Sequence, residues 1–237
     1  VVGFGSLSVE ATPFPAYTGS ALMPVTTMAP INGSVPLLYQ SVVLATTLRL
    51  SDGHAIPLGN GAVMFEALES DAVGASAASS VSLDNAGGIV TGQREGKAFV
   101  FASFGGERSA DALELQVLGR GAGVAVKSFL ALGLTGGDVV AGAPPTVRGF
   151  SGAAFGQAQL GVVLSDDRRY SALFSPAGAA AIPGLVAFSL VAPADVASVD
   201  AARGRVSLLD NYEELAVLRA TAASAVGGPL STTLGFA

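Results

Sequence analysis

The feature that most constrains the fold is an internal repeat with a very long period. The pattern Asp-x-Ala-x-Gly-x-Val begins at Asp84 and again at Asp200, 116 residues later. Two further pairs of segments match upstream, at offsets of 114 and 123 residues: 48–53 with 162–167, and 63–65 with 186–188. The offsets change across Gly-, Ala- and Pro-rich segments, where insertions into loops cost little. A period of this length indicates two duplicated domains and not a solenoid of small repeats.

The repeated pattern is typical of a β-hairpin. In the first copy, Val81 and Leu83 alternate with polar residues, the segment from Asp84 to Gly88 has turn chemistry, and Val90 lies on the return strand. The spacing therefore predicts strand, turn and strand in each copy.

The repeat also decides one ambiguous segment. By propensity alone residues 211–223 favour a helix, with Asp210 and Glu213 imitating a capping box. Their counterpart in the first copy, residues 98–103, has the composition of a strand. We therefore predict a strand from Leu215 to Ala222, against the local propensity.

Composition favours β structure with many turns. Only 13% of the 237 residues are charged, whereas Gly numbers 31 and Pro 12. The mean hydropathy of +0.57 raises the question of a membrane span. Two long uncharged stretches, 11–48 and 174–194, are interrupted by prolines that would break a helix, so we expect no membrane insertion by this segment.

Charge and cysteine content exclude several classes of function. A net charge of −6, with 12 scattered Lys and Arg residues, argues against nucleic acid as a partner. The chain has no cysteine, so disulfides, thiolate metal sites and a cysteine nucleophile are excluded. The sequence begins at Val1 without a signal-peptide pattern, which we interpret as a processed end or the cut edge of a longer protein.

The repeated segments carry a family resemblance. The run VSLDNAGGIVTGQREGKAFVFASFGG, closed by ALELQVLG, resembles the C-terminal half of a bacterial immunoglobulin-like group 2 (BIG2-like) domain. The second copy, VASVDAARGRVSLLDNYEELAVLRATAAS, resembles it less closely, since Leu208 and Leu209 replace Thr91 and Gly92. The resemblance implies an all-β fold of two immunoglobulin-like β-sandwich domains in tandem. Domains of this kind occur as spacers, adhesins and receptor ectodomains, so the resemblance says little about function.

These patterns give four expected segments. They are an N-terminal extended segment over residues 1–25, a first domain over 26–119, a second domain over 120–226, and a C-terminal tail or linker over 227–237. The Gly-rich run from Gly119 to Gly123 matches neither of the common phosphate-binding patterns, so we interpret it as a linker between the domains.

No residue pattern indicates catalysis. His54, the sole histidine, follows a turn dipeptide and is interpreted as a solvated loop residue. Residues 149–152 are one residue short of the elbow that presents a catalytic serine.

Two carboxylate pairs deserve mention, because a glycosidase needs only two carboxylates. They are Glu66 with Glu69, and Glu213 with Glu214. Strand alternation places Glu66 on a solvent-facing side and separates Glu213 from Glu214, so we interpret them as surface residues. We therefore predict no enzyme, no catalytic residue and no cofactor.

Three binding features remain open. Calcium ligands are available at four aspartates, although their spacing matches no known calcium loop: Asp166, Asp167, Asp195 and Asp210. Aromatic platforms for sugars are scarce, because the chain has no Trp and only four Tyr, and the phenylalanines are expected in the cores: Phe65, Phe99, Phe101, Phe155, Phe174 and Phe188. Asn32 begins the glycosylation sequon Asn-Gly-Ser and is a predicted glycan attachment site.

The sequence therefore predicts a structural or adhesive module of a larger extracellular fibre or cell-surface protein. Its expected partners are other protein chains or neighbouring domains, because a surface this poor in charge exposes apolar area. The alternative is a ligand-binding module that recognises glycan or calcium through loops at the end of a sandwich.

Overall fold

The structure is a computed structural model, and its strands are joined by turns and short 3-10 turns. It describes residues 3–17, 19–34, 36–72, 74–135, 155–170, 184–192, 196–210, 216–223 and 228–236. Among these residues no helix has the length and apolar character needed to cross a membrane. The chain divides into two compact units: Val1–Ile31 with Leu38–Gly123, and Asn32–Leu37 with Val124–Ala237.

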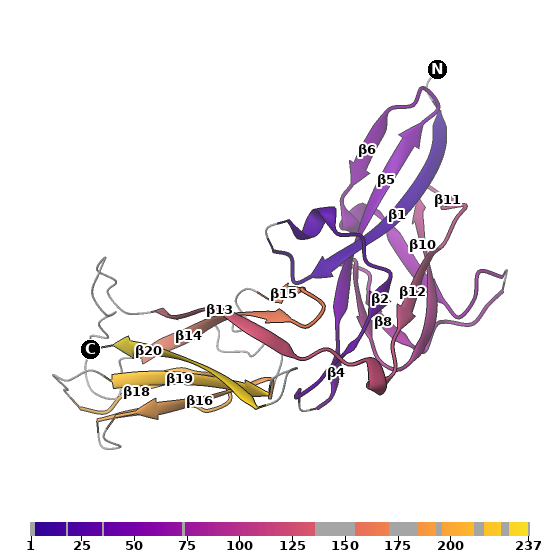
Figure 1. The fold of residues 1–237 in the computed structure, drawn as a ribbon. Helices are drawn as coiled ribbons and strands as arrows, with labels where there is room; N and C mark the ends of the chain where they lie inside the picture. Colours follow the sequence, from indigo (N-terminus) through magenta and orange to yellow (C-terminus); the bar gives the residue numbers. More distant parts are fainter. Residues whose placement is uncertain are drawn as a thin grey trace. The chain divides into compact units, whose positions relative to one another are not determined.

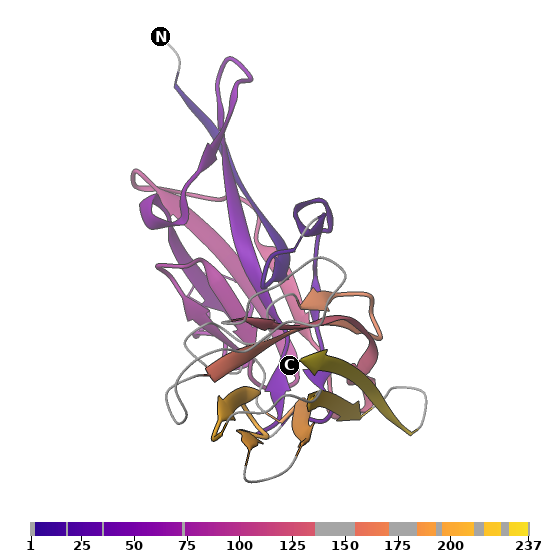
Figure 2. The ribbon, with the colours of Figure 1, turned by 90° about the vertical axis from the view of Figure 1, so that its left-hand side faces the viewer.

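Unit 1 is built from two main sheets. In the first sheet the strand order is β1-β5-β9-β8, with β6 on β5; in the second it is β11-β10-β12-β2, with β7 on β10. The bounds are β1 (Phe4–Phe14), β2 (Thr27–Met28), β5 (Ser41–Leu50), β6 (Ala55–Leu58), β7 (Met64–Leu68), β8 (Val81–Asp84), β9 (Ile89–Gly92), β10 (Gly96–Phe104), β11 (Glu107–Arg108) and β12 (Leu113–Val117). Short elements complete the unit: η1 (Ser20–Leu22), β3 (Pro30–Ile31), β4 (Leu38–Tyr39), η2 (Asn60–Ala62) and η3 (Arg120–Ala122). The β5–β6 hairpin and the start of β1 project beyond the rest of unit 1 (Figures 1 and 2).

Unit 2 repeats this plan. One sheet has the order β13-β14-β18-β17, with β15 on β14, and the other has the order β16-β19-β20. The bounds are β13 (Val126–Thr135), β14 (Phe155–Leu164), β15 (Arg169–Tyr170), β16 (Val186–Val191), β17 (Ala197–Val199), β18 (Arg205–Leu208), β19 (Ala216–Ala223) and β20 (Pro229–Phe236). In Figure 1, β16, β19 and β20 lie side by side.

The strand order identifies the fold class. Of the seven main strands in each unit, the first, second, fifth and fourth form one sheet, and the third, sixth and seventh form the other. This is the order of a seven-stranded immunoglobulin sandwich. In unit 1 the short strand β2 also pairs in parallel with the last main strand, β12. The prediction of two immunoglobulin-like β-sandwiches is confirmed.

The core of unit 1 follows from strict alternation along its strands. In β5 the inward positions are Val42, Leu44, Thr46 and Leu48, and each of them is buried. Neighbouring strands contribute to the same core: Leu7, Ala11, Phe65, Val81, Val90, Ala98, Val100, Ala102, Leu115 and Val117. Because burial is worth roughly 25 cal/mol per Å² of apolar surface, this interior is the main source of stability.

The core of unit 2 has the same plan with different side chains. In β14 the side chain of every second residue from Ala158 to Leu164 faces the core, and these residues are at most 1% exposed. The other strands add Val186, Phe188, Ala197, Val206, Ala216, Leu218, Ala220, Ala222 and Phe236.

Each unit also buries one glutamine whose side chain has a backbone partner. In unit 1 the N–H of Ala29 donates to Oε1 of Gln40 at 3.0 Å. In unit 2 Nε2 of Gln157 donates to the carbonyl oxygen of Arg203 at 2.7 Å.

The duplicated turn has the same local geometry in both units. Oδ1 of Asp84 accepts a hydrogen bond from the N–H of Ala86 at 3.1 Å, and Oδ1 of Asp200 accepts one from Ala202 at 3.0 Å. Gly88 and Gly204 both have positive φ, of 62° and 66°. The sequence repeat is therefore a structural repeat, down to the turn that joins β8 to β9 and β17 to β18.

The lost glycine of the second copy has a steric explanation. A Cβ atom at Gly92 would lie 2.8 Å from Cβ of Tyr39 and 3.1 Å from Cγ1 of Val117. Tyr39 belongs to β4 of unit 1. The offset of 116 residues between the two turns places Leu208 at the position of Gly92, one residue earlier than the sequence comparison predicts. Leu208 ends β18 and is partly exposed, so unit 2 has room there for a side chain.

Two expected boundaries differ from the structure. Residues 4–14, assigned to a separate N-terminal segment, form β1 and pair with β5 from Phe4–Leu50 to Phe14–Ser41. Residues 229–236, assigned to a tail, form β20 and pair with β19, and Phe236 is 2% exposed. In β1 the residues Leu7, Val9 and Ala11 alternate with polar residues, and Leu7 and Ala11 are buried in the core. Both segments are therefore part of their sandwiches.

The strand predicted against helix propensity is present. It is β19, which begins at Ala216 and ends at Ala223, one residue beyond the predicted end. Leu215, where the prediction began, lies outside the described residues.

Candidate interaction surface

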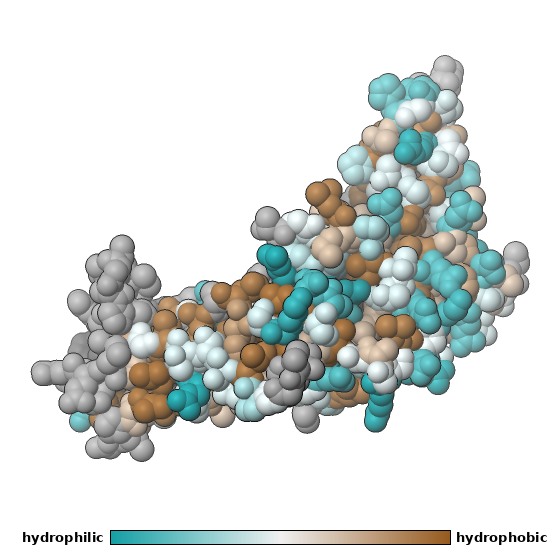
Figure 3. Space-filling view, viewed as in Figure 1, coloured by the Kyte–Doolittle hydropathy of each residue, from teal (hydrophilic) through white to brown (hydrophobic). Residues whose placement is uncertain are grey.

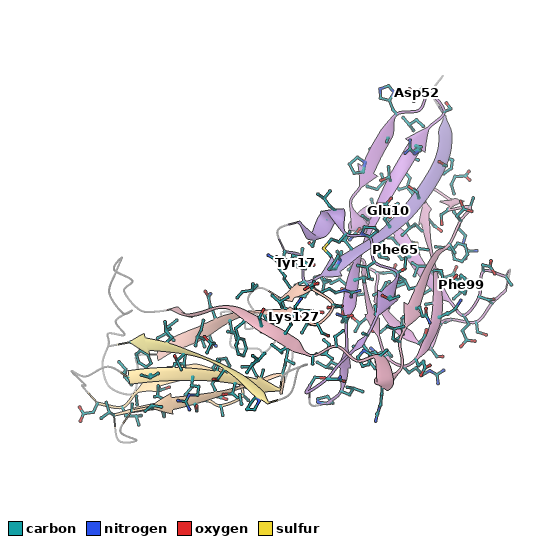
Figure 4. All side chains as sticks on the ribbon, in the orientation of Figure 1. Glu10, Tyr17, Asp52, Phe65, Phe99 and Lys127 are labelled. Carbon is teal, nitrogen blue, oxygen red and sulfur yellow. The ribbon has the colours of Figure 1, made fainter. Side chains whose placement is uncertain are left out.

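His54 lies in the exposed turn between β5 and β6. Its Nδ1 atom is 3.2 Å from Oδ2 of Asp52, and its side chain is 79% exposed. Figure 4 labels Asp52 at the projecting end of this hairpin. The hydroxyl of the adjacent Ser51 accepts a hydrogen bond from the N–H of Gly3. The three side chains therefore lie on an exposed turn.

The carboxylates considered for glycoside hydrolysis have different partners. Glu66 is on β7 and its Oε2 is 3.0 Å from Nη2 of Arg108. Glu69 follows that strand and accepts a hydrogen bond from Ser79. Glu213 and Glu214 lie outside the described residues.

Two of the aspartates considered for calcium are ion-paired within unit 2. Asp166 is 3.3 Å from Nε of Arg168, and Asp167 is 2.6 Å from Nζ of Lys127, which Figure 4 labels on β13. Asp210 is exposed, and Asp195 lies outside the described residues. Within the described parts of the chain no group of three or more His, Asp or Glu side chains is arranged to hold a metal ion.

The sequon is in the turn between β3 and β4. Asn32 is exposed, Gly33 has a φ of 93°, and Ser34 is buried. The asparagine side chain is therefore accessible in the folded protein.

The surface that sequence reasoning missed is the outer face of the sheet β7-β10-β12. Along β10 the residues Ala98, Val100 and Ala102 are fully buried and face the core. Period-2 alternation therefore turns Phe99 and Phe101 to the opposite side. Figure 4 shows Phe65 inside unit 1 and Phe99 on its outer side. The expectation that these phenylalanines are mostly core residues holds for Phe65 and Phe188 and is wrong for Phe99. Phe174 and the side chain of Phe155 lie outside the described residues.

Phe101 is covered by a cation from its own chain. The guanidinium carbon of Arg108 is 3.7 Å from the centroid of the Phe101 ring. The same guanidinium is paired with Glu66, which lies directly opposite Phe101 on β7. The ring is consequently 6% exposed although it faces outward.

Phe99 lies beside an open depression of about 330 Å³. Its lining consists of Asp71, Phe99, Phe101, Ala110, Asp111, Ala112 and Glu114. Glu114 lies opposite Phe99 on β12 and is 2.6 Å from Nζ of Lys97. Asp71 and Asp111 are exposed and have no ion pair with any described residue. The depression therefore combines aromatic surface with unneutralised negative charge, and Figure 3 shows hydrophilic residues gathered around β10 and β12.

Comparison with known proteins gives low similarities. No family model matches the chain, and no curated protein sequence matches it. The resemblance to BIG2 domains therefore stays a prediction.

Several solved structures align over nearly the whole chain. The extracellular domain of protocadherin gammaB4 is 11% identical over 99% of this chain and 34% of its own, with a TM-score of 0.31. Domains 4–9 of the surface layer protein SbsC are 14% identical over 100% and 31%, with a TM-score of 0.31. Drosophila N-cadherin EC1-3 is 12% identical over 99% and 67%, with a TM-score of 0.25. The chain thus spans about a third of the protocadherin and surface-layer structures, and its fold assignment rests on its own strand order.

Proposed function

We propose that this chain is a structural or adhesive module of a larger extracellular or cell-surface protein and that it acts by packing against other protein chains. The observation that carries the proposal is the outer face of β7-β10-β12, where an ordered sheet presents aromatic side chains and charged groups outward. Such a face suits protein contacts, because aromatic residues and arginine are enriched where proteins meet.

The modular plan supports the same proposal. Each unit has its own core and the same strand order, as expected for domains that serve as spacers in longer assemblies. We further propose that both units are BIG2-like and that they belong to a larger extracellular fibre or cell-surface protein.

Self-association is the first partner test. We expect sedimentation velocity to show reversible, concentration-dependent association of the full chain, because its surface carries few charges to oppose contact. A single monomeric species from micromolar to millimolar concentration would remove copies of this chain as partners. Sedimentation and thermal melting in the presence of calcium serve as a control. A calcium-dependent change in association or in melting temperature would favour a ligand-binding module instead.

Secretion from a eukaryotic host tests the predicted glycan site at Asn32. When the chain is secreted from eukaryotic cells, we expect one N-linked glycan at Asn32, because this exposed residue heads the sole sequon of the sequence. Intact-mass measurement before and after treatment with a peptide N-glycosidase detects the glycan, and Asn32→Gln should abolish the mass difference. Asn60→Gln, a matched amide change outside a sequon, should retain it. Secretion of the wild-type chain without a glycan would contradict the site.

A further inference from the structure

We propose that the depression beside Phe99 receives an arginine side chain from a partner protein. This inference rests on the proposed function, protein packing, and names the surface of unit 1 and the partner chemistry. It follows from three features of the sheet β7-β10-β12: a template within the chain, an equivalent aromatic ring with no guanidinium over it, and a local excess of negative charge.

The template is the group formed by Phe101, Arg108 and Glu66. The guanidinium lies 3.7 Å from the ring centroid and 3.0 Å from the carboxylate of the opposite strand. A planar guanidinium satisfies both neighbours at once, because its face contacts the ring and its edge donates hydrogen bonds to the carboxylate. This sheet therefore already binds one arginine in this way.

Phe99 occupies the equivalent position on the other side of β10. It precedes Phe101 by two residues, so both rings face outward, and its directly opposite residue on β12 is Glu114, as Glu66 is opposite Phe101 on β7. Among the described residues no cation lies over the Phe99 ring, whereas Arg108 lies over Phe101. Phe99 is partly exposed, and the carboxylate opposite it, Glu114, is paired with the ammonium of Lys97 and not with a guanidinium.

Charge around Phe99 favours a cation. Lys97 neutralises Glu114, whereas Asp71 and Asp111 line the same depression without a cationic partner among the described residues. The whole chain carries a net charge of −6, so the surrounding field adds to this local excess.

The chemistry favours arginine over a metal ion or lysine. A metal ion needs converging oxygen ligands, and the described residues form no such group. The aromatic lining instead favours a planar, weakly hydrated cation that can stack on a ring. The guanidinium of arginine has these properties, and the compact ammonium of lysine does not. The open depression leaves room for the apolar stem of the side chain against Ala110 and Ala112.

The experiment is a titration of the full chain with three blocked tripeptides, Gly-Arg-Gly, Gly-Lys-Gly and Gly-citrulline-Gly, at low salt. The methyl resonances of Ala110 and Ala112 report binding by NMR. We expect saturable shifts with the arginine peptide, weaker binding of the lysine peptide, and no binding of the neutral citrulline peptide. Equal responses to arginine and citrulline, equal affinities for arginine and lysine, or no shift at these methyls would overturn the proposal.

Variants locate the site. Asp111→Asn should weaken binding of the arginine peptide by about threefold, as for an exposed ion pair, and Phe99→Leu by about twofold to fivefold. Glu107→Gln is the matched control, because it removes the same charge from an exposed residue of the neighbouring strand β11 that does not line the depression. If it weakened binding as much as Asp111→Asn, the effect would be general electrostatics and the assignment would be wrong. Association of wild-type chains is measured separately, so protein packing can stand even if the arginine site fails.

Discussion

Gly204→Ala should lower the stability of unit 2 by about 2–4 kcal/mol, as the sum of backbone strain and overpacking. Gly204 has a φ of 66°, a conformation that costs an alanine about 1 kcal/mol. An added Cβ would also lie 2.8 Å from Cβ of Ala158 and 3.0 Å from a ring carbon of Phe188. Both neighbours are buried in the core, so neither can move away freely.

Gly88→Ala is the matched control in unit 1. Its φ of 62° gives the same backbone cost, but the added Cβ would meet the side-chain amide of Asn60, which can rotate away. We expect a loss of about 1–2 kcal/mol, which includes the hydrogen bond from Asn60 Nδ2 to the carbonyl oxygen of Gly87. Hydrogen exchange measured by mass spectrometry separates the units through peptides from β14 and β5. Equal losses for the two variants would contradict this steric explanation.

Leu218→Ala should destabilise unit 2 by about 2–5 kcal/mol, the usual cost of a large cavity in a core. Leu218 is fully buried on β19, which lies between β16 and β20 and pairs there with Leu190 and Leu234. We expect faster exchange throughout unit 2 and unchanged protection in β5 and β10, because each unit has its own core.

Val217→Ala is the control for this cavity. Val217 is the neighbouring residue on the same strand, is only partly buried and faces the other side of the sheet. Its truncation should cost about 1 kcal/mol or less. A comparable loss for both variants would show that the core of unit 2 is not as described. A loss of protection in unit 1 with Leu218→Ala would show that the two units do not unfold independently.

The fold could be predicted largely because the sequence contains two copies of one domain, which can be compared with each other. The side chains of Asp84 and Asp200 make the same turn, and the repeat correctly overrode the helix propensity of the segment that forms β19. The first and last strands were missed because the repeat does not cover them: its matched segments begin at residue 48 in the first copy and end before residue 229 in the second. The alternation of Leu7, Val9 and Ala11 with polar residues was present in β1, and its pairing with β5 follows it.

The outer face of β10 was missed for a different reason. The strand reads Gly-Lys-Ala-Phe-Val-Phe-Ala-Ser-Phe, so both of its faces carry apolar residues and alternation alone does not say which face is inside. Large rings are usually expected in the core. In this strand the small residues Ala98, Val100 and Ala102 fill the interior, and Phe99 is left outside.

The shared strand order has a consequence for folding. Each sandwich forms by pairing segments far apart in sequence, such as Val42 with Val90 and Gly156 with Val206, so both should fold slowly. Each strand has a counterpart at the same position of the other copy. While both units are unfolded, counterparts can exchange between the copies, which is the characteristic misfolding of tandem repeats.

The two buried glutamines oppose such exchange. Gln40 accepts from Ala29 just before β5 begins, whereas Gln157 lies within β14 and donates to Arg203. If a strand entered the wrong sandwich, its own glutamine, or the glutamine of the strand that it replaced, would lack this hydrogen-bond partner. An unsatisfied buried polar group costs about 1–3 kcal/mol. We therefore expect these buried polar groups to disfavour the exchange of strands between the two sandwiches.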